Sequence, residues 1–342
     1  MISATKLTFG RDLAEARALI ESQGLRFEEH CDDFVGVFQD GRLVAAAARA
    51  GYVFEMITIL PECQGGEMLG ALLTELHRLG RDAGHEVFWI FTRPEHVPSF
   101  APYHFQLLVT GGKAALLESG NGFGRWVGEN AARIRPGRNG ACVINGNPFT
   151  LGHLHLVEQA SRRVDTLYLF VVREDRSVFP YAVRRRLAER ATARLANVVV
   201  LDTSRYAVSA ATFPSYFLKR LDEVAREQMR LDVHLFGQRI APAFSVVARF
   251  VGSEPADPAT RAYNEVMREV LPDHGVEWVE IPRIAGAGRP AAEFISASRV
   301  RAALARREFE MIRGWVPEAT MEFLLSPEGS ALAERIAAGT AA

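Results

Sequence analysis

The chain has 342 residues, of which 48% are hydrophobic and 24% are charged, and its formal net charge is −1. This length exceeds what one hydrophobic core usually organises, so we expect two domains. The near-neutral charge gives no support for a nucleic-acid partner. The N-terminus lacks the features of a signal peptide and no run of about 18 apolar residues occurs, so we expect a cytoplasmic protein without a membrane span. Cys31, Cys63 and Cys142 lie far apart without CxxC spacing, which excludes a disulfide framework and a zinc knuckle, and we predict no metal ligands.

Residues 1–135 are predicted to form a mixed α+β domain. The Asp40-Gly41 pair separates two apolar segments, which is a strong signal of a β-hairpin. The expected elements are a helix over Asp12–Gln23, strands over Phe34–Gln39, Arg42–Arg49 and Val53–Leu60, a helix over Met68–Ala83, and a strand over Val87–Thr92.

Residues 136–330 show a different rhythm, in which strands that are apolar throughout alternate with helices. This alternation predicts a parallel sheet covered on both faces. Turn-forming and basic residues over Ile134–Gly140 are expected to form the linker, and the Ala-rich residues 331–342 a C-terminal tail. The expected strands are Ala141–Ile144, Asp165–Val172, Val198–Asp202, Val233–Phe236, Arg249–Gly252 and Val276–Ile281. The expected helices are Leu154–Val164, Val183–Leu195, Tyr216–Glu227, Thr260–Val270, Ala297–Arg306 and Glu308–Trp315.

The stretch from Val143 to His155 joins the first strand of the second domain to its first helix. Ligands of open parallel sheets bind at such turns, beyond the carboxyl ends of the strands. Gly152 allows the backbone to approach a ligand closely, and the new helix offers free N–H groups to a phosphate. His153 can donate to phosphoryl oxygens as charge develops on them. The stretch therefore predicts a phosphate site, against the simpler interpretation of a capped turn with a polar surface histidine.

The segment Ile295–Arg301 supports the same site. Ser296 and Ser298 can cap a helix and leave N–H groups for a triphosphate. Arg301, one turn later, can reach the β- and γ-phosphate oxygens with both of its terminal nitrogens. Taken alone, the segment is more typical of a plain capped helix with a solvated arginine.

These two stretches resemble the signatures of a known superfamily. Thr150-Leu-Gly-His153 is similar to the T/H-x-G-H motif of nucleotidyltransferases, and Ile295–Arg301 is similar to their later I-S-S/T-T-x-I-R motif. Segments between and beyond them resemble the citrate lyase ligase family over nearly the whole chain, and the first domain resembles an acetyltransferase-like (GNAT) domain. The segments that carry this resemblance are Phe91–Glu95, Arg173–Tyr181, Ala211–Lys219, Phe236–Pro242, Phe250–Pro255 and Thr260–Asn264. The fold that it implies is α/β: a GNAT-like α+β domain followed by a Rossmann-like nucleotidyltransferase domain with a parallel sheet.

The resemblance also implies a reaction. An ATP- and Mg²⁺-dependent ligase of this family adenylates acetate and releases pyrophosphate. It then transfers the acetyl group to the thiol of the phosphoribosyl-dephospho-CoA prosthetic group on the acyl carrier subunit of citrate lyase. The residues predicted for this site are Thr150, His153 and Arg301 as catalytic residues, Asn147, Gly152, Ser296 and Ser298 at the phosphates, and Lys219 and Arg239 as possible substrate-binding cations.

The first domain departs from the acetyltransferase pattern at Gln64–Leu69. Glu67 stands where the acetyl-CoA loop usually has glycine, and a carboxylate repels a pyrophosphate. We therefore expect this domain to dock the carrier protein or its CoA-like arm, or to be structural, rather than to act as an N-acetyltransferase. Three other functions of the whole chain stay open: an acetate ligase for another acyl carrier of the malonate decarboxylase type, a nucleotidyltransferase that acts on a cofactor precursor, and a non-catalytic ATP-sensing module that binds a partner.

Overall fold

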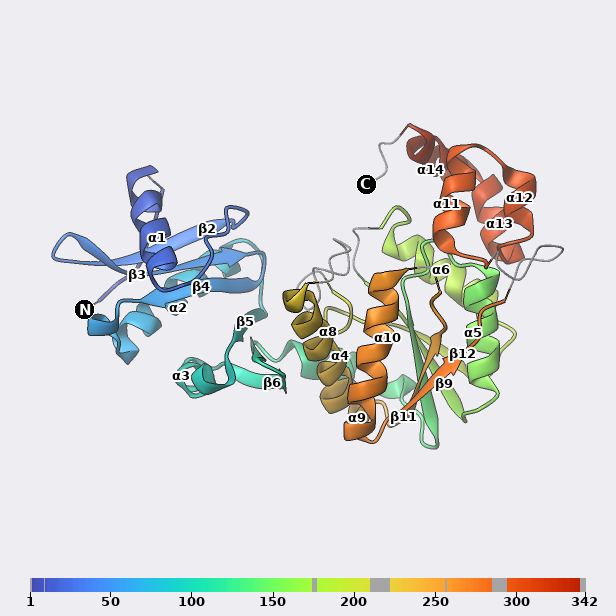
Figure 1. Ribbon diagram of the computed structural model, residues 1–342, viewed down its shortest axis with the longest axis horizontal. Coiled ribbons are helices and arrows are strands. Elements are labelled where there is room, and N and C mark those ends of the chain that lie inside the picture. Colours follow the sequence, from blue (N-terminus) through green and yellow to red (C-terminus); the bar gives the residue numbers. More distant parts are fainter. Residues whose placement is uncertain are drawn as a thin grey trace. The chain divides into compact units, whose positions relative to one another are not determined.

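The computed structural model describes residues 2–8, 10–173, 177–209, 222–255, 257–284 and 294–338. Contacts divide the chain into two compact units, Met1–Trp126 and Val127–Ala342, each with its own sheet and core (Figure 1). This division falls nearer to the N-terminus than the boundary expected after residue 135. Within the described ranges, no helix is both long and apolar enough to cross a lipid bilayer.

Unit 1 is built on a mixed sheet whose described strands follow the order β1-β2-β3-β4-β5-β7-β6, with only β4 and β5 pairing in parallel. Both α1 and α2 contact β3, and the residues of β3 from Leu43 to Arg49 are all buried. The predicted hairpin is confirmed, since Asp40 and Gly41 have φ angles of 50° and 75° as a type I′ turn requires. The elements are β1 (Thr5–Lys6), α1 (Gly10–Ser22), β2 (Asp33–Gln39), β3 (Arg42–Ala50), β4 (Val53–Ile59), α2 (Gly66–Asp82), β5 (Phe88–Thr92), α3 (Val97–Phe100), β6 (Gln106–Gly111), β7 (Ala114–Ser119) and α4 (Gly122–Glu129).

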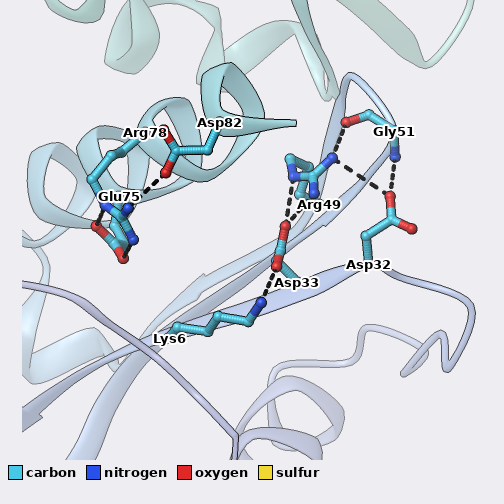
Figure 2. Close-up of polar contacts among 8 residues, drawn as sticks. All are labelled: Lys6, Asp32, Asp33, Arg49, Gly51, Glu75, Arg78 and Asp82. Atoms are coloured by element: carbon cyan, nitrogen blue, oxygen red, sulfur yellow. Dashed lines mark hydrogen bonds and ion pairs between the residues drawn. The ribbon is translucent and has the colours of Figure 1, made fainter. Parts of the chain in front are cut away.

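A polar network ties the first strands of unit 1 together (Figure 2). Arg49 on β3 donates from Nε to Asp33 on β2 at 2.8 Å, and Lys6 Nζ lies 2.6 Å from the other oxygen of Asp33. Burial would raise the pKa of Asp33, but the hydrogen bonds from Lys6 and Arg49 outweigh it and lower that pKa. Arg49 also donates to the carbonyl of Gly51 at 2.6 Å, and the Gly51 N–H donates to Asp32 at 2.7 Å. The network therefore holds the carboxylate of Asp32, which directly precedes β2, against the turn between β3 and β4.

Unit 2 has the predicted parallel sheet, in the order β10-β9-β8-β11-β12. The strand order reverses at β8, because β9 lies on one side of it and β11 on the other. Helices α11 to α14 pack on one another and gather at one end of the unit (Figure 1). The elements are β8 (Asn139–Ile144), α5 (Leu151–Ser161), β9 (Thr166–Val171), α6 (Tyr181–Thr192), β10 (Val198–Asp202), α8 (Glu223–Leu235), the π-helix η5 (Phe236–Ile240), α9 (Ala241–Ala243), β11 (Val246–Gly252), α10 (Pro258–Val270), β12 (Glu277–Ile281), α11 (Ala297–Ala305), α12 (Phe309–Arg313), α13 (Glu318–Leu325) and α14 (Pro327–Ala337).

The sheet of unit 2 is covered on both faces. Leu169 and Val171 of β9 belong to the core that includes residues of α5 and α6. The alternate residues Tyr168 and Phe170 meet the ring of Phe244 on the other face, with ring centroids 5.5 and 5.3 Å apart. This two-sided burial explains why the strand is apolar throughout.

The strand expected over Val233–Phe236 is wrong. These residues continue α8 and begin η5, with Val233 and Phe236 buried. The preceding Asp232 is also buried, and it accepts hydrogen bonds from the Tyr263 hydroxyl at 2.6 Å and from the Val208 N–H at 2.8 Å. A short apolar run cannot be distinguished from a buried helix segment by its periodicity, so only these tertiary contacts reveal the helix.

Candidate active site

The loop between β8 and α5 lies at the carboxyl edge of the parallel sheet, at the strand where the order reverses. Such positions are the usual ligand sites of open α/β sheets. Thr150 is the N-cap of α5, and its Oγ1 accepts the backbone N–H of His153 at 3.4 Å. In return, Nδ1 of His153 accepts the backbone N–H of Thr150 at 3.0 Å. This reciprocal capping box fixes the imidazole at the first turn of the helix.

The geometry determines the protonation of His153. Because Nδ1 accepts a backbone N–H, it carries no proton, and the neutral ring holds its proton on Nε2. Burial, together with the positive charge of Arg283, lowers the pKa of His153 from 6.5 to about 4. The ring also packs beside Phe149, with centroids 5.4 Å apart. His153 is therefore a neutral imidazole whose donor is Nε2–H.

A buried arginine on α6 holds the start of the loop. Arg184 is fully buried and donates to the backbone and side-chain oxygens of Asn145 at 2.9 and 3.0 Å. It also donates to the carbonyls of Val172 at 2.7 Å and Phe179 at 2.8 Å. The Ser177 hydroxyl adds a hydrogen bond to Asn145 Oδ1 at 3.1 Å. Arg184 was not predicted as a site residue, although its spacing from two buried α6 residues three and four positions later was a signal that it faces inward.

The C-terminal helices support the other end of the loop. The Thr320 hydroxyl of α13 donates to the Phe149 carbonyl at 3.0 Å. The Leu151 N–H donates to the Trp315 carbonyl at 2.9 Å, between α12 and α13. Both contacts join segments that are far apart in the sequence, so the loop is held from both sides.

The structure brings the predicted Ser–Arg segment next to this loop. Arg301 donates from Nη1 to the carbonyl of Asn147 at 2.5 Å and from Nη2 to the Ser298 hydroxyl at 3.1 Å. The amide oxygen of Asn147 accepts the Phe179 N–H at 3.0 Å, so this side chain positions the loop. The predicted residues of the two stretches thus meet at one edge of the sheet.

The start of α11 has the expected cap. Ser296 is the N-cap, and its hydroxyl accepts the backbone N–H of Arg299 at 3.3 Å. Gly152 lies against this segment, because a Cβ added to it would be 3.3 Å from the Ile295 carbonyl oxygen. The N-terminal turns of α5 and α11 therefore lie close together, and helix N-termini attract anions.

Sequence reasoning gave no role to an ion pair at the ends of β11 and β12. Arg283, two residues after β12, pairs with the carboxylate of Glu254, and its N–H donates to the Ser253 hydroxyl at 3.1 Å. Arg283 is close enough to His153 to lower its pKa. Glu254 and Arg283 each lie two residues after the carboxyl end of a parallel strand, and this position was the sequence signal that could have pointed to them.

Of the two other predicted cations, only Arg239 lies within the described residues. Lys219 lies outside the described residues. Arg239 is exposed on η5, which leads into the amino end of β11. Gly237 beside it packs on the ring of His274, which precedes β12. The structure thus places Arg239 at the edge of the sheet opposite to the loop that carries His153.

Comparisons with known proteins identify relatives of the whole chain. The family model for the citrate lyase ligase C-terminal domain matches residues 139–324. A citrate (pro-3S)-lyase ligase of Klebsiella pneumoniae is 39% identical over 308 residues, which cover 88% of this chain and 89% of that protein. A protein of the same name from Escherichia coli (strain K12) is 32% identical and covers 95% of this chain and 93% of its own. Among solved structures, N-acetylglutamate synthase from Neisseria gonorrhoeae, complexed with coenzyme A and N-acetyl-glutamate, matches 35% of each chain at 20% identity, with a TM-score of 0.30.

Proposed function

The chain belongs to the citrate lyase ligase family and is a ligase, and from this premise we propose that it uses ATP and acetate to acetylate the prosthetic group of the citrate lyase acyl carrier subunit. The acetylated lyase is the active form in this proposal. The observation that carries the proposal is the neutral His153, held by the capping box at the N-terminus of α5 and close to Arg301.

In the first step, a carboxylate oxygen of acetate attacks the α-phosphorus of ATP. An O–P bond forms, the bond from that phosphorus to the pyrophosphate oxygen breaks, and acetyl-AMP and pyrophosphate result. The Nε2–H of His153 donates to an α-phosphate oxygen as negative charge increases there. Arg301, Ser296, Ser298 and the free N–H groups of α11 hold the departing pyrophosphate. Positioning and charge neutralisation are the main demands of such a step.

In the second step, the thiol of the carrier's prosthetic group attacks the acetyl carbon of acetyl-AMP. A C–S bond forms, the bond from the acetyl carbon to the AMP oxygen breaks, and the thiol proton passes to solvent. AMP is a good leaving group, whereas the oxygen of free acetate is not, so the adenylation makes the transfer possible.

We propose that Mg²⁺ enters this site on the phosphates of ATP. The cation would be held mainly by phosphate oxygens, since Mg²⁺ is commonly bound by substrate phosphates together with water. The donor set agrees with this role: the carboxylate of Glu254 is paired with Arg283, and His153 and Arg301 offer N–H donors to phosphate oxygens. The protein groups therefore bind the phosphates, and the ion neutralises their remaining charge.

We also propose that unit 1 docks the carrier and does not act as an acetyltransferase. Glu67 lies in the first turn of α2, where its charge disfavours a phosphate. The Tyr103 hydroxyl donates to the Gly66 carbonyl, and its ring lies against Gly70. The tyrosine thus occupies the Gly66 carbonyl and packs on the first turns of α2, while Glu67 stays exposed there.

Three assays test the proposed function: acetate-dependent exchange of pyrophosphate into ATP, mass detection of acetyl-AMP, and citrate lyase activity after the chain is mixed with deacetylated lyase. The wild-type chain should catalyse the exchange, form acetyl-AMP and activate the lyase. His153→Asn should lose the exchange. His155→Asn on the same helix is the matched control and should retain it. Exchange that does not need acetate, or that survives His153→Asn unchanged, would contradict the assignment.

A further inference from the structure

Three side chains of different ligand chemistry meet in unit 1, apart from the ligase site. His30 and Cys31 lie in the segment between α1 and β2, and Glu55 lies on β4. One donor atom from each lies within 4.8 Å of the other two. Across the described ranges, this is the one group of three or more histidine, cysteine and acidic residues that meets this condition. We call it the His30–Cys31–Glu55 cluster.

The distances in the cluster are close to those of a tetrahedral metal site. Glu55 Oε2 lies 3.8 Å from His30 Nε2 and 3.7 Å from Cys31 Sγ. Ligand bonds of Zn²⁺ are about 2.0–2.3 Å long, which places neighbouring donors of a tetrahedron about 3.3–3.6 Å apart. Two of the three donor–donor distances are therefore within a few tenths of an ångström of the value that a tetrahedral Zn²⁺ site requires. The side chain of His30 is 61% exposed, so it has room to rotate and shorten the third distance, between His30 and Cys31.

A second carboxylate lies on the far side of the imidazole. His30 Nδ1 is 3.7 Å from Glu28 Oε2, while Nε2 faces Glu55. A histidine that binds a metal through one ring nitrogen usually directs the other N–H to a carboxylate, which sets the tautomer and strengthens the ligand. Glu28 is itself anchored, because its backbone N–H donates to the Met56 thioether at 3.1 Å. This arrangement is typical of a metal-binding histidine rather than of a lone surface residue.

The charges around the thiol favour a cation. The carboxylate of Glu55 lies 3.7 Å from the Cys31 thiol, and the carboxylate of Glu28 lies on the other side of His30. The carboxylate of Asp32, next to Cys31 in the sequence, is held by Arg49 and Gly51 (Figure 2). A divalent cation would displace the thiol proton to solvent and balance the carboxylates.

We propose that His30, Cys31 and Glu55 bind one Zn²⁺ ion, with Glu28 orienting His30. The mixed nitrogen, sulfur and oxygen donors suit Zn²⁺ and not the oxygen-seeking Mg²⁺ or Ca²⁺. Water completes the fourth position. The ion joins the segment between α1 and β2 to β4, so its role is to stabilise unit 1, and it is independent of the ligase chemistry in unit 2.

The test uses the purified full-length chain after treatment with a chelator, titrated with Co²⁺ as a spectroscopic substitute for Zn²⁺. We expect one equivalent of Co²⁺ to produce a thiolate-to-cobalt charge-transfer band that Zn²⁺ abolishes. Cys31→Ser should lose the band, whereas Cys63→Ser, the matched control at another half-buried free thiol of unit 1, should retain it. Glu28→Gln should keep the band but weaken Co²⁺ binding about 10-fold.

Two results would overturn the proposal: a wild-type chain without the band, or a band that persists in Cys31→Ser. Circular dichroism of each variant checks folding. If Cys31→Ser does not fold, Glu55→Gln tests the same site. This variant leaves the thiol in place and should weaken Co²⁺ binding at least about 10-fold. Unchanged affinity in that variant would also overturn the proposal.

Discussion

Acid should leave His153 neutral at a pH where an ordinary histidine is mostly protonated. Burial, with a contribution from Arg283, lowers the pKa of His153 from 6.5 to about 4. At pH 5.5 an imidazole with the ordinary pKa would be about 10% neutral, whereas one with a pKa of 4 would be about 97% neutral. The kcat/KM for ATP should therefore change by less than about 5% through this group between pH 7.5 and 5.5, instead of falling about tenfold.

The same pKa makes stability depend on pH. The unfolded chain takes up a proton at His153 near pH 6.5, and the folded chain does so only near pH 4. Between these values the unfolded state binds more protons, so the free energy of unfolding falls as the pH drops through this window. The full difference is about 3 kcal/mol, reached near pH 4. His153→Asn should remove this part of the pH dependence, and His155→Asn should not.

The direct assay is an NMR titration of the histidine ring signals, with the His153 signal assigned by its loss in His153→Asn. Urea unfolding at pH 7 and at pH 4.5 measures the stability effect in the same proteins. A titration midpoint above about 6 would refute the reasoning, because it would mean that burial and Arg283 do not keep the ring neutral.

Two further substitutions test the supports of the site. Arg301→Lys should lower kcat/KM for ATP about 10²-fold, because lysine lacks the planar fork that can contact both Asn147 and a phosphate. The pyrophosphate exchange assay measures this loss. A loss smaller than about threefold would contradict the role of Arg301. Arg184→Met should lower the free energy of unfolding of unit 2 by about 3–5 kcal/mol, because it leaves the buried carbonyl of Phe179 and the partly buried oxygens of Asn145 without this donor. Urea denaturation followed by tryptophan fluorescence measures this loss, and a change below about 1 kcal/mol would show that water replaces the guanidinium.

The architecture of unit 2 could be predicted because its signals are local and strong. Strands that are apolar throughout can only be buried on both faces, and this is how β9 lies. Glycine gave a less reliable signal. Asn139 and Gly140 were expected in the linker but open β8, and Gly140 lies so close to Phe250 that a Cβ would be 2.6 Å from a ring carbon. A glycine that permits close packing looks the same in the sequence as one that makes a turn.

The candidate site could be predicted in part. The motif residues around His153 and Arg301 lie together because both segments follow the carboxyl ends of strands. The supports of the loop could be predicted only in part, since the spacing of Arg184 indicates a buried side chain but does not reveal its partners Asn145 and Phe179. Arg239 was expected near the site because the apolar run before it was interpreted as a strand. That run forms a helix instead, which places Arg239 at the amino end of β11.

The contacts of the loop with Thr320 and Trp315 have a consequence for how the protein is made. Phe149 and Leu151 leave the ribosome long before the residues that bind their backbone groups. During synthesis, β8 and α5 can assemble with their neighbours while the turn between them still lacks two of its hydrogen bonds. The nascent chain should thus complete the hydrogen bonding of this loop only when translation has passed α13.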